Sequence, residues 1–296
     1  MPSVIVSSPE YDRAERNEPI VPWWSFTKTA IAAAALSLAA QNKIALDDAL
    51  TAKPYTWRQL LQHRASLGDY GSLPDYHAAV VSNAEPWPVA EMHARTNAST
   101  LLYPPGEGWL YSNIGYAEVR RLIEDVAGAP LRVVLRDRVL RPLGLTQARL
   151  AESASDLAGV DMNGVRYDPR WVYHGLLVGP LHEARQLLDG VIAGELLPQR
   201  ERDAMMSPFS LGEPIAGRPF KAPAYGLGLM IDNDAPIMRY GHTGGGPGSV
   251  IAVYRTQSAD GHFTRAAFAH GDDPAIVESA AFAREPDDAA HHPAAP

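Results

Sequence analysis

The chain has 296 residues, 46% of them hydrophobic and 20% charged, with a net charge of −8 at pH 7. This composition is typical of a globular protein with a substantial core, and the negative charge disfavours nucleic acid or an anionic membrane as partner. The absence of cysteine excludes a disulfide scaffold, a thiolate nucleophile and a cysteine-ligated zinc site. Four lysines against 22 arginines limit where a lysine-based site can lie.

The N-terminal segment has no targeting pattern. Its first ten residues contain no basic side chain and only one three-residue apolar run, Val4 to Val6, so they do not fit a secretory signal. We therefore expect a cytoplasmic protein. The run from Ala30 to Ala40 is too short and too rich in alanine to span a bilayer, so we expect no membrane as partner.

The first part of the chain alternates between irregular and helical segments. In order we expect a short strand, a loop, an alanine-rich helix, a short helical continuation, a helix that starts with a capping box at Thr56 and Gln59, and a long irregular region. These segments are residues 3–7, 11–22, 25–42, 46–50, 56–64 and 68–108.

The middle of the chain is predicted to be helical and the last part to be a sheet. Apolar spacing indicates helices at 115–127, 131–140, 180–192 and 198–206. Strands are then expected at 225–231, 249–254 and 262–269, separated by turns at 232–234, 241–248 and 259–261. Because short turns join consecutive strands, the sheet should be antiparallel. A helix at 275–283 closes the pattern.

One motif could carry nucleophilic chemistry. Ser25 lies where an irregular segment becomes the alanine-rich helix, and Lys28 follows three residues later on the same helical face. A serine becomes a strong nucleophile when a neighbouring group takes its proton, and a desolvated lysine with a lowered pKa can do so. The helix N-terminus favours a developing anion at this place. The same spacing also fits a helix N-cap followed by an exposed lysine.

A second motif, Tyr111-Ser112-Asn113, ends the long irregular region and precedes a helix. A tyrosine held near a lysine can exchange a proton with a leaving group, and an asparagine amide can donate to a substrate carbonyl. The alternative is a half-buried tyrosine followed by an asparagine that caps the helix.

The third motif is glycine-rich. Five of the eight residues from Gly241 to Gly248 are glycine, which permits close approach of a ligand to the backbone. A backbone N–H at this place could complete an oxyanion hole with the N–H of Ser25. The motif lacks the Walker lysine of a phosphate loop. A simple glycine-rich turn between two strands remains the alternative.

Taken together, these motifs resemble those of the penicillin-recognising serine enzymes. The likeness is to the class C β-lactamase-like branch, which also holds D-peptidases and carboxylesterases. In that branch the second motif is Tyr-x-Asn and the third is often His-Thr-Gly, as at 111–113 and 242–244. The segments 60–67, 105–106 and 141–145 are similar as well, so the resemblance covers roughly residues 20 to 270.

The resemblance implies an α/β (α+β) fold of the β-lactamase/transpeptidase type, in which an antiparallel sheet is flanked by helices and a mainly helical domain is inserted. The sheet-and-helix domain would be discontinuous, from residues 1–52 and 222–284, and residues 53–221 would form the helical domain. We expect residues 285–296 to be a disordered tail.

The resemblance also implies roles for single residues. Ser25 would be the acylated nucleophile, Lys28 its proton acceptor or the electrostatic partner of the base, and Tyr111 the group that moves the proton to the leaving atom. Oxyanion donors would be the N–H groups of Ser25 and Gly245. The residues implied on the substrate side are Asn113, His242, Thr243, Gly244 and Gly245.

Two features depart from the family pattern. Only 24 residues precede Ser25, where relatives usually have a helix and a strand pair, so part of the sheet could be missing or rebuilt and a homo-oligomer favoured. His242 stands in place of the usual lysine, which removes a permanent cation. That change favours neutral esters or amides over acids. Four tryptophans could line an apolar pocket or could be core residues: Trp23, Trp24, Trp87 and Trp109.

We therefore expect an esterase-like serine hydrolase that acts on small esters or amides through a Ser25 acyl-enzyme. One alternative is a β-lactamase or D-amino-acid peptidase, and another is a catalytically inactive binding protein on the same fold. No cofactor and no metal are expected, because His174 and His182 lack ligand spacing and no His-Glu-x-x-His motif occurs. The partner would be a small ester, amide or β-lactam molecule.

Overall fold

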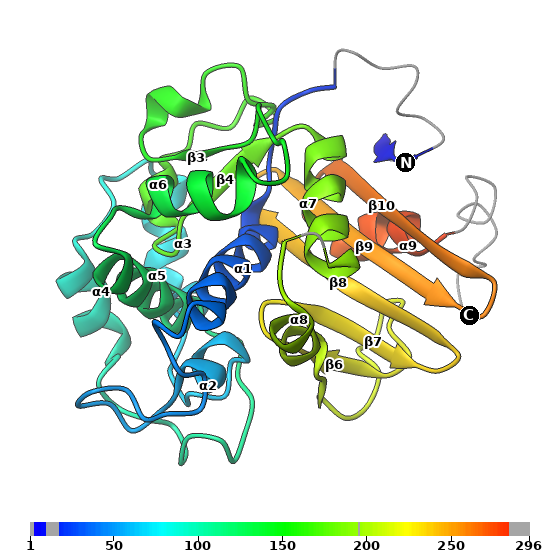
Figure 1. Ribbon diagram of the computed structural model, residues 1–296. Helices are drawn as coiled ribbons and strands as arrows, with labels where there is room; N and C mark the ends of the chain where they lie inside the picture. The colour runs from blue at the N-terminus through cyan, green and yellow to red at the C-terminus, as the bar shows by residue number, and fades with distance from the viewer. Residues whose placement is uncertain (1–2, 10–17, 195, 284–296) are drawn as a thin grey trace.

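A seven-stranded antiparallel sheet forms one half of the protein (Figure 1). The computed structural model describes residues 3–9, 18–194 and 196–283. The strand order is β1-β10-β9-β8-β7-β6-β5, and every neighbouring pair is antiparallel, as predicted. The strands are β1 Val4–Ser7, β5 Phe209–Ser210, β6 Pro223–Tyr225, β7 Met230–Asp234, β8 Ile237–Gly246, β9 Ser249–Ser258 and β10 Gly261–His270.

Helices cover both faces of this sheet. Side chains alternate along the central strands, so Ile251 and Phe268 join the large core on one face while Val250 and Ala267 join a smaller core on the other. Helix α7, Leu181–Ala193, packs on the first face, and α9, Pro274–Phe282, packs on the second. Because both faces are buried, β9 and β10 each contain a continuous apolar run, at residues 250–254 and 266–269.

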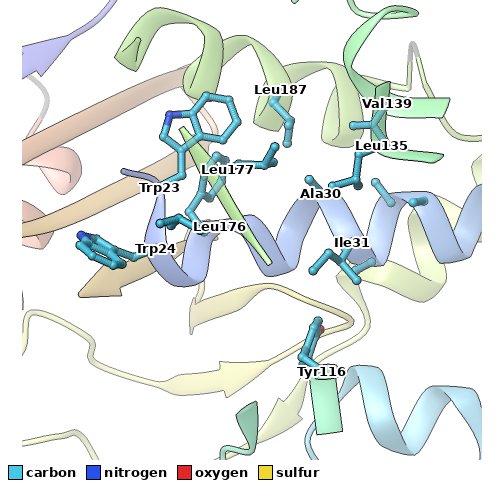
Figure 2. Packing of buried hydrophobic residues seen from close by; sticks show 14 of the residues in the cluster. Trp23, Trp24, Ala30, Ile31, Tyr116, Leu135, Val139, Leu176, Leu177 and Leu187 are labelled. Atoms are coloured by element: carbon cyan, nitrogen blue, oxygen red, sulfur yellow. The ribbon is translucent and has the colours of Figure 1, made fainter. Parts of the chain in front are cut away.

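Helix α1, Thr27–Ala40, is the central helix of the molecule. The helix is rich in alanine, and most of its residues are buried, as expected for a helix that is apolar on all sides. Its neighbours are α5 Asn113–Ala127, α6 Leu131–Leu135, α7 and α8 Gln199–Met206. Figure 2 shows α1 between Tyr116 on one side and Leu135 and Val139 on the other.

A small second sheet holds the segment before Ser25. Its order is β2-β4-β3, with β2 Val21–Pro22, β3 Arg149–Ala151 and β4 Leu176–Gly179. Strands of two to four residues show too little alternation to be found in a sequence, so the sequence pattern does not predict this sheet.

Most predicted helices are confirmed. Helices α5, α7, α8 and α9 lie within a few residues of their expected bounds, and α6 continues as a π-helical turn, Arg136–Leu140. Helix α2, Trp57–Leu61, begins with both hydrogen bonds of the predicted capping box: Thr56 Oγ1 accepts from the Gln59 N–H, and Gln59 Oε1 accepts from the Thr56 N–H.

Other predictions are wrong. Residues 68–108 contain a 3₁₀ turn, Tyr70–Ser72, and two helices, α3 Pro74–Val81 and α4 Val89–Thr96. Two of the prolines that suggested a loop stand at or just before a helix N-terminus, where proline is tolerated: Pro74 is the first residue of α3, and Pro88 precedes α4. Residues 46–50 form turns and a bridge between Ala49 and Thr56 in place of a helix. The predicted strand 225–231 is two strands, joined by a turn through Gly228 with φ +71°.

The glycine-rich segment also differs from the prediction. Gly241 to Gly246 are the second half of strand β8, and the turn consists of Pro247 and Gly248 alone. The boundaries of the two expected domains stay a prediction; α7, from the expected helical domain, packs on the sheet. Residues 11–17 and the expected tail lie outside the described residues. Within those residues, no helix is long and apolar enough to cross a bilayer.

Candidate active site

Ser25 lies in the 3₁₀ turn η1, Trp24–Phe26, which leads into α1. Ser25 is half-buried, whereas Trp24 and Phe26 on either side are buried. Trp24 has φ +41°, a conformation that is rare for an aromatic residue and costs energy. Its indole Nε1–H donates to Ser249 Oγ at 3.0 Å, which holds the ring in place. The bend that presents Ser25 is therefore maintained by packing around Trp24.

The glycines of β8 let this turn lie directly on the sheet. A Cβ atom on Gly244 would be 2.7 Å from Ser25 N and 2.8 Å from Trp23 O, and one on Gly246 would be 2.5 Å from the Trp24 ring. Since real Cβ atoms essentially never come so close, side chains at these positions would push η1 away. The glycine motif thus serves the close approach of two backbone segments.

The same strand presents an open edge beside Ser25. Pro247 and Gly248, with φ +81°, form a two-residue turn, so Gly246 and Ser249 are the hydrogen-bonded pair next to it. The N–H of Gly245 then points away from β9. Strand β7 pairs with β8 only as far as Gly241, and Gly245 is exposed. This geometry fits the expected use of the Ser25 and Gly245 N–H groups as oxyanion donors.

Lys28 is fully buried beside Ser25. Its Nζ lies 3.2 Å from Ser25 Oγ, 2.7 Å from Asn113 Oδ1 and 3.2 Å from His174 Nε2. Burial lowers the pKa of Lys28 from 10.5 to about 7, although the charge of the Asp69 carboxylate opposes the shift. A large fraction of the amine is therefore neutral near pH 7 and able to accept the Ser25 proton.

Tyr111 and Asn113 approach this pair from the N-terminus of α5. The cap of α5 is Ser112, whose Oγ accepts from the Gly115 N–H at 2.9 Å, so the alternative role of Asn113 as the cap is wrong. Tyr111 makes a side-chain hydrogen bond with Ser25, and burial raises its pKa. The phenol is therefore neutral and able to donate a proton.

Asp69 orients Asn113 and was not predicted from the sequence. Its Oδ1 accepts from the Asn113 N–H at 2.8 Å, and its Oδ2 accepts from Asn113 Nδ2 at 3.3 Å. Since the amide nitrogen faces Asp69, the amide oxygen faces Lys28. Burial raises the pKa of Asp69, whereas the Asn113 N–H and the Lys28 charge oppose that shift. In the sequence, Asp69 is marked only by its position two residues after the segment 60–67, which resembles the family.

His242 belongs to a buried chain of hydrogen bonds. His242 Nδ1 is 2.6 Å from the Thr243 carbonyl, which can only accept, so Nδ1 carries the proton. Nε2 therefore accepts from the Tyr225 hydroxyl at 2.9 Å. On the other side, His63 Nδ1 accepts from the Ser112 N–H at 3.1 Å, and His63 Nε2–H donates to Tyr225 Oη at 3.1 Å. We call His63, Tyr225 and His242 the histidine chain.

Both histidines of this chain are neutral. Burial lowers the pKa of His242 to about 3 and that of His63 well below its usual value. Both nitrogens of His242 are used within the protein, and the side chain is fully buried. The predicted contact between His242 and substrate is therefore not available in this structure. His63 and Tyr225 carry no local sequence signal for this role.

Thr243 points to the opposite face of the sheet. Its hydroxyl contacts the Tyr254 hydroxyl at 2.8 Å and donates to the Glu278 carboxylate on α9. The prediction of Thr243 as a substrate contact is thus wrong, because successive side chains on a strand alternate between faces. Gly244 lies against Ser25 and Trp23, and its lack of a side chain allows this close approach.

The four tryptophans have different surroundings. Trp23 and Trp24 are core residues, so the core alternative is confirmed for them. Trp87 packs on Trp171, with ring centroids 5.1 Å apart. Trp109 lies beside the site, with its ring centroid 6.5 Å from that of Tyr111. Within the described residues, no group of three His, Asp or Glu side chains could hold a metal ion.

Comparison with known proteins identifies the family. A model of the beta-lactamase family matches residues 11–283. The chain belongs to this family. Its members are serine hydrolases, and the antiparallel sheet with flanking helices described above is the β-lactamase/transpeptidase-like fold. Among curated proteins, none matches the chain.

Solved structures with the same fold include amide-cleaving enzymes. A D-stereospecific amidohydrolase from Streptomyces sp. is 23% identical, with 90% of this chain and 88% of that chain covered and a TM-score of 0.74. The D-amino acid amidase from Ochrobactrum anthropi SV3, complexed with D-phenylalanine, is 20% identical, with coverages of 97% and 91% and a TM-score of 0.75. An octameric penicillin-binding protein homologue from Pyrococcus abyssi is 20% identical, with coverages of 88% and 64% and a TM-score of 0.70.

Proposed function

We propose that this protein hydrolyses small amides and esters that carry no essential carboxylate, through an acyl-enzyme on Ser25. The observation that carries the proposal is the buried Lys28 amine, 3.2 Å from Ser25 Oγ and with its pKa lowered to about 7. A lysine in this state can act as general base at neutral pH. A lysine on a solvated surface would stay protonated and could not.

In acylation, neutral Lys28 takes the Ser25 proton while Oγ attacks the carbonyl carbon. The N–H groups of Ser25 and Gly245 donate to the oxygen as it becomes negative. Tyr111 gives its proton to the leaving nitrogen or oxygen when the carbonyl bond to that atom breaks, and it recovers a proton from Lys28. Water then attacks the acyl-enzyme with the same groups in reverse order, which releases the acid and restores Ser25.

The charges around the site support neutral substrates. In the family pattern a lysine at position 242 would attract a substrate carboxylate, but His242 is neutral and its nitrogens are used by Tyr225 and Thr243. The Asp69 carboxylate lies nearby and would repel an acid. Relatives that are a D-stereospecific amidohydrolase and a D-amino acid amidase support amides as substrates. The ester preference expected from the sequence stays a prediction, as does self-association, which an octameric relative supports.

Intact mass spectrometry after incubation with a fluorophosphonate tests the chemistry. We expect one adduct on the native chain, none on Ser25→Ala and much slower labelling of Lys28→Ala. A folded native chain that stays unlabelled would contradict the hydrolase proposal and favour a binding protein on this fold.

A substrate panel tests the specificity. It compares D- and L-phenylalanine amide and a short p-nitrophenyl ester with a chromogenic cephalosporin, which carries a carboxylate. We expect higher kcat/KM on the neutral substrates. Comparable or faster cephalosporin hydrolysis would support a β-lactamase or D-peptidase instead.

A further inference from the structure

Lys28 Nζ has three neighbours, one for each hydrogen of an ammonium group. They are Ser25 Oγ, Asn113 Oδ1 and His174 Nε2, at 3.2, 2.7 and 3.2 Å. The first was expected from the Ser25 to Lys28 spacing, whereas Asn113 was expected only as a substrate contact. The third comes from a loop more than 140 residues away in the sequence.

The neutral amine has two hydrogens and one lone pair, and its neighbours decide where the lone pair points. Asn113 Oδ1 takes one hydrogen, because Asp69 fixes the amide with its oxygen toward Lys28. If His174 Nε2 is an acceptor, it takes the second hydrogen and the lone pair faces Ser25. If Nε2 carries a proton, that N–H occupies the lone pair, and Lys28 can only donate to Ser25.

We propose that His174 is a positioning residue for Lys28, an inference that rests on the proposed function. In the tautomer with the proton on Nδ1, His174 Nε2 accepts a hydrogen bond from Lys28. This directs the lysine lone pair to Ser25. The same tautomer accepts from the ammonium form after Lys28 has taken the proton. It therefore suits both states of the base, whereas the Nε2–H tautomer blocks the lone pair of the neutral amine and has no acceptor for the ammonium.

The backbone around His174 holds the ring at this place. Just after His174, strand β4 bonds to both sides of the Ser25 turn: the Leu177 N–H donates to Thr27 Oγ1 at 3.0 Å, and the Trp23 N–H donates to the Leu177 carbonyl at 2.8 Å. Gly175, with φ +108°, makes the tight turn before the strand. The nucleophile, the base and His174 are thus fixed to one another through β4.

The remaining groups around Lys28 do not replace His174. Tyr111 and Tyr116 offer ring faces, with Nζ 5.0 and 5.5 Å from their centroids. Burial first, and then the Lys28 charge, keep the pKa of His174 well below its usual value, so the ring stays neutral. The titratable and charged groups that act on Lys28 or His174 are Asp69, His63, His242, Tyr111, Tyr116 and Arg120.

His174 Nδ1 is buried and has no hydrogen-bond partner among the described residues. A buried, unpaired polar atom is unfavourable for folding and is usually eliminated. In the proposed tautomer Nδ1 carries the proton, so the contact of Nε2 with Lys28 has to offset this cost.

Two substitutions separate positioning from packing. His174→Leu removes the acceptor, whereas the side-chain oxygen of His174→Gln can still accept from Lys28. We expect kcat/KM of His174→Leu to fall by about tenfold or more, with its pH midpoint moved to lower pH because the ammonium has lost an acceptor. His174→Gln should stay within about threefold of the native chain. His262→Leu, at an exposed position of β10, is the matched control.

Two kinetic outcomes would overturn the proposal. One is an unchanged pH midpoint in His174→Leu, and the other is equal losses in the Leu and Gln variants, since both indicate a packing role alone. Fluorophosphonate labelling of Ser25 in the native chain is measured in parallel. Its absence would refute the proposed hydrolase function but not the hydrogen bond from Lys28 to His174 Nε2.

The tautomer is tested by NMR on the native protein, with His174→Gln used only to assign the signals. In uniformly ¹⁵N-labelled native protein, the two ring nitrogens of His174 are identified by the signals that disappear in His174→Gln. A proton on Nδ1 and none on Nε2 supports the proposal even if no substrate is found. A proton on Nε2 overturns it, however active the enzyme is.

Discussion

Two buried polar clusters lie side by side in this protein and behave differently. The histidine chain of His63, Tyr225 and His242 uses every nitrogen of its rings in hydrogen bonds within the protein. Lys28 is equally buried, yet it has a lowered pKa of about 7 and three partners that suit both of its protonation states. Histidine is usually the residue that titrates near neutral pH. Here that role belongs to the lysine, and the histidines are fixed as neutral scaffold.

Removing the base should have the largest effect. Lys28→Met should lower kcat/KM by about 10²- to 10⁴-fold, the usual contribution of a general base. Steady-state kinetics on the best neutral substrate, with Ser25→Ala as the reference for zero activity, gives this number. A loss below tenfold would mean that another group accepts the Ser25 proton.

The same variant should be more stable than the native chain, and more so at low pH. Between about pH 7 and 10.5 the unfolded chain holds a proton on Lys28 that the folded chain lacks, so native stability rises with pH across this range. Below pH 7 the full cost of a buried ammonium is present. Urea unfolding of Lys28→Met and the native chain should therefore differ more at pH 6 than at pH 9. An equal difference at both pH values would contradict the lowered pKa.

Breaking the histidine chain should affect stability first. Tyr225→Phe leaves His63 Nε2–H without an acceptor and His242 Nε2 without a donor, and an unsatisfied buried group costs about 1–3 kcal/mol. Urea unfolding at pH 7 measures the loss, and the pH midpoint of kcat/KM should stay in place. A moved midpoint without lost stability would show that the chain tunes Lys28 and is not a scaffold.

The histidine chain should also make the fold sensitive to acid. The pKa of His242 is about 3 in the folded state against 6.5 in the unfolded one, so only the unfolded chain gains its proton as the pH falls below 6.5. Native stability should fall by about 1.4 kcal/mol per pH unit from this group. In His242→Phe that part of the slope, measured by urea unfolding between pH 4 and 6, should be absent; an unchanged slope would refute the neutral assignment.

The smallest effect is expected from Asp69→Asn. The variant's amide oxygen still accepts from the Asn113 N–H, but Asn113 Nδ2 loses its acceptor, and the negative charge that raises the pKa of Lys28 is gone. The pH midpoint of kcat/KM should move to lower pH by on the order of one unit. A shift to higher pH would be inconsistent with Asp69 as the opposing charge.

The features of the fold and the site that could be predicted from the sequence are those encoded by residues close together in the chain. The Ser25 to Lys28 spacing, the capping box at Thr56 and the consecutive strands near the C-terminus are local patterns, and the structure contains them. The second half of β8 was predicted as a turn, because clustered glycines usually mark turns between strands. They are there because η1 packs on the strand, which a local pattern does not reveal.

The partners of the motif residues could not be predicted for a similar reason. Asp69, His174 and Tyr225 come from three distant segments and meet only in the folded chain. None has a spacing that distinguishes it from a surface residue. The small sheet that brings His174 to Lys28 consists of strands too short to detect.

The rate at which a fluorophosphonate labels Ser25 as a function of pH shows directly whether Lys28 activates the serine. It is followed by intact mass in the native chain and in Lys28→Met. We predict a rate that rises with an apparent pKa near 7 and then levels off in the native chain, and labelling at least about 100-fold slower in the variant. A rate that keeps rising to pH 10, or one that does not depend on Lys28, would contradict the claim that a buried, neutral lysine activates Ser25.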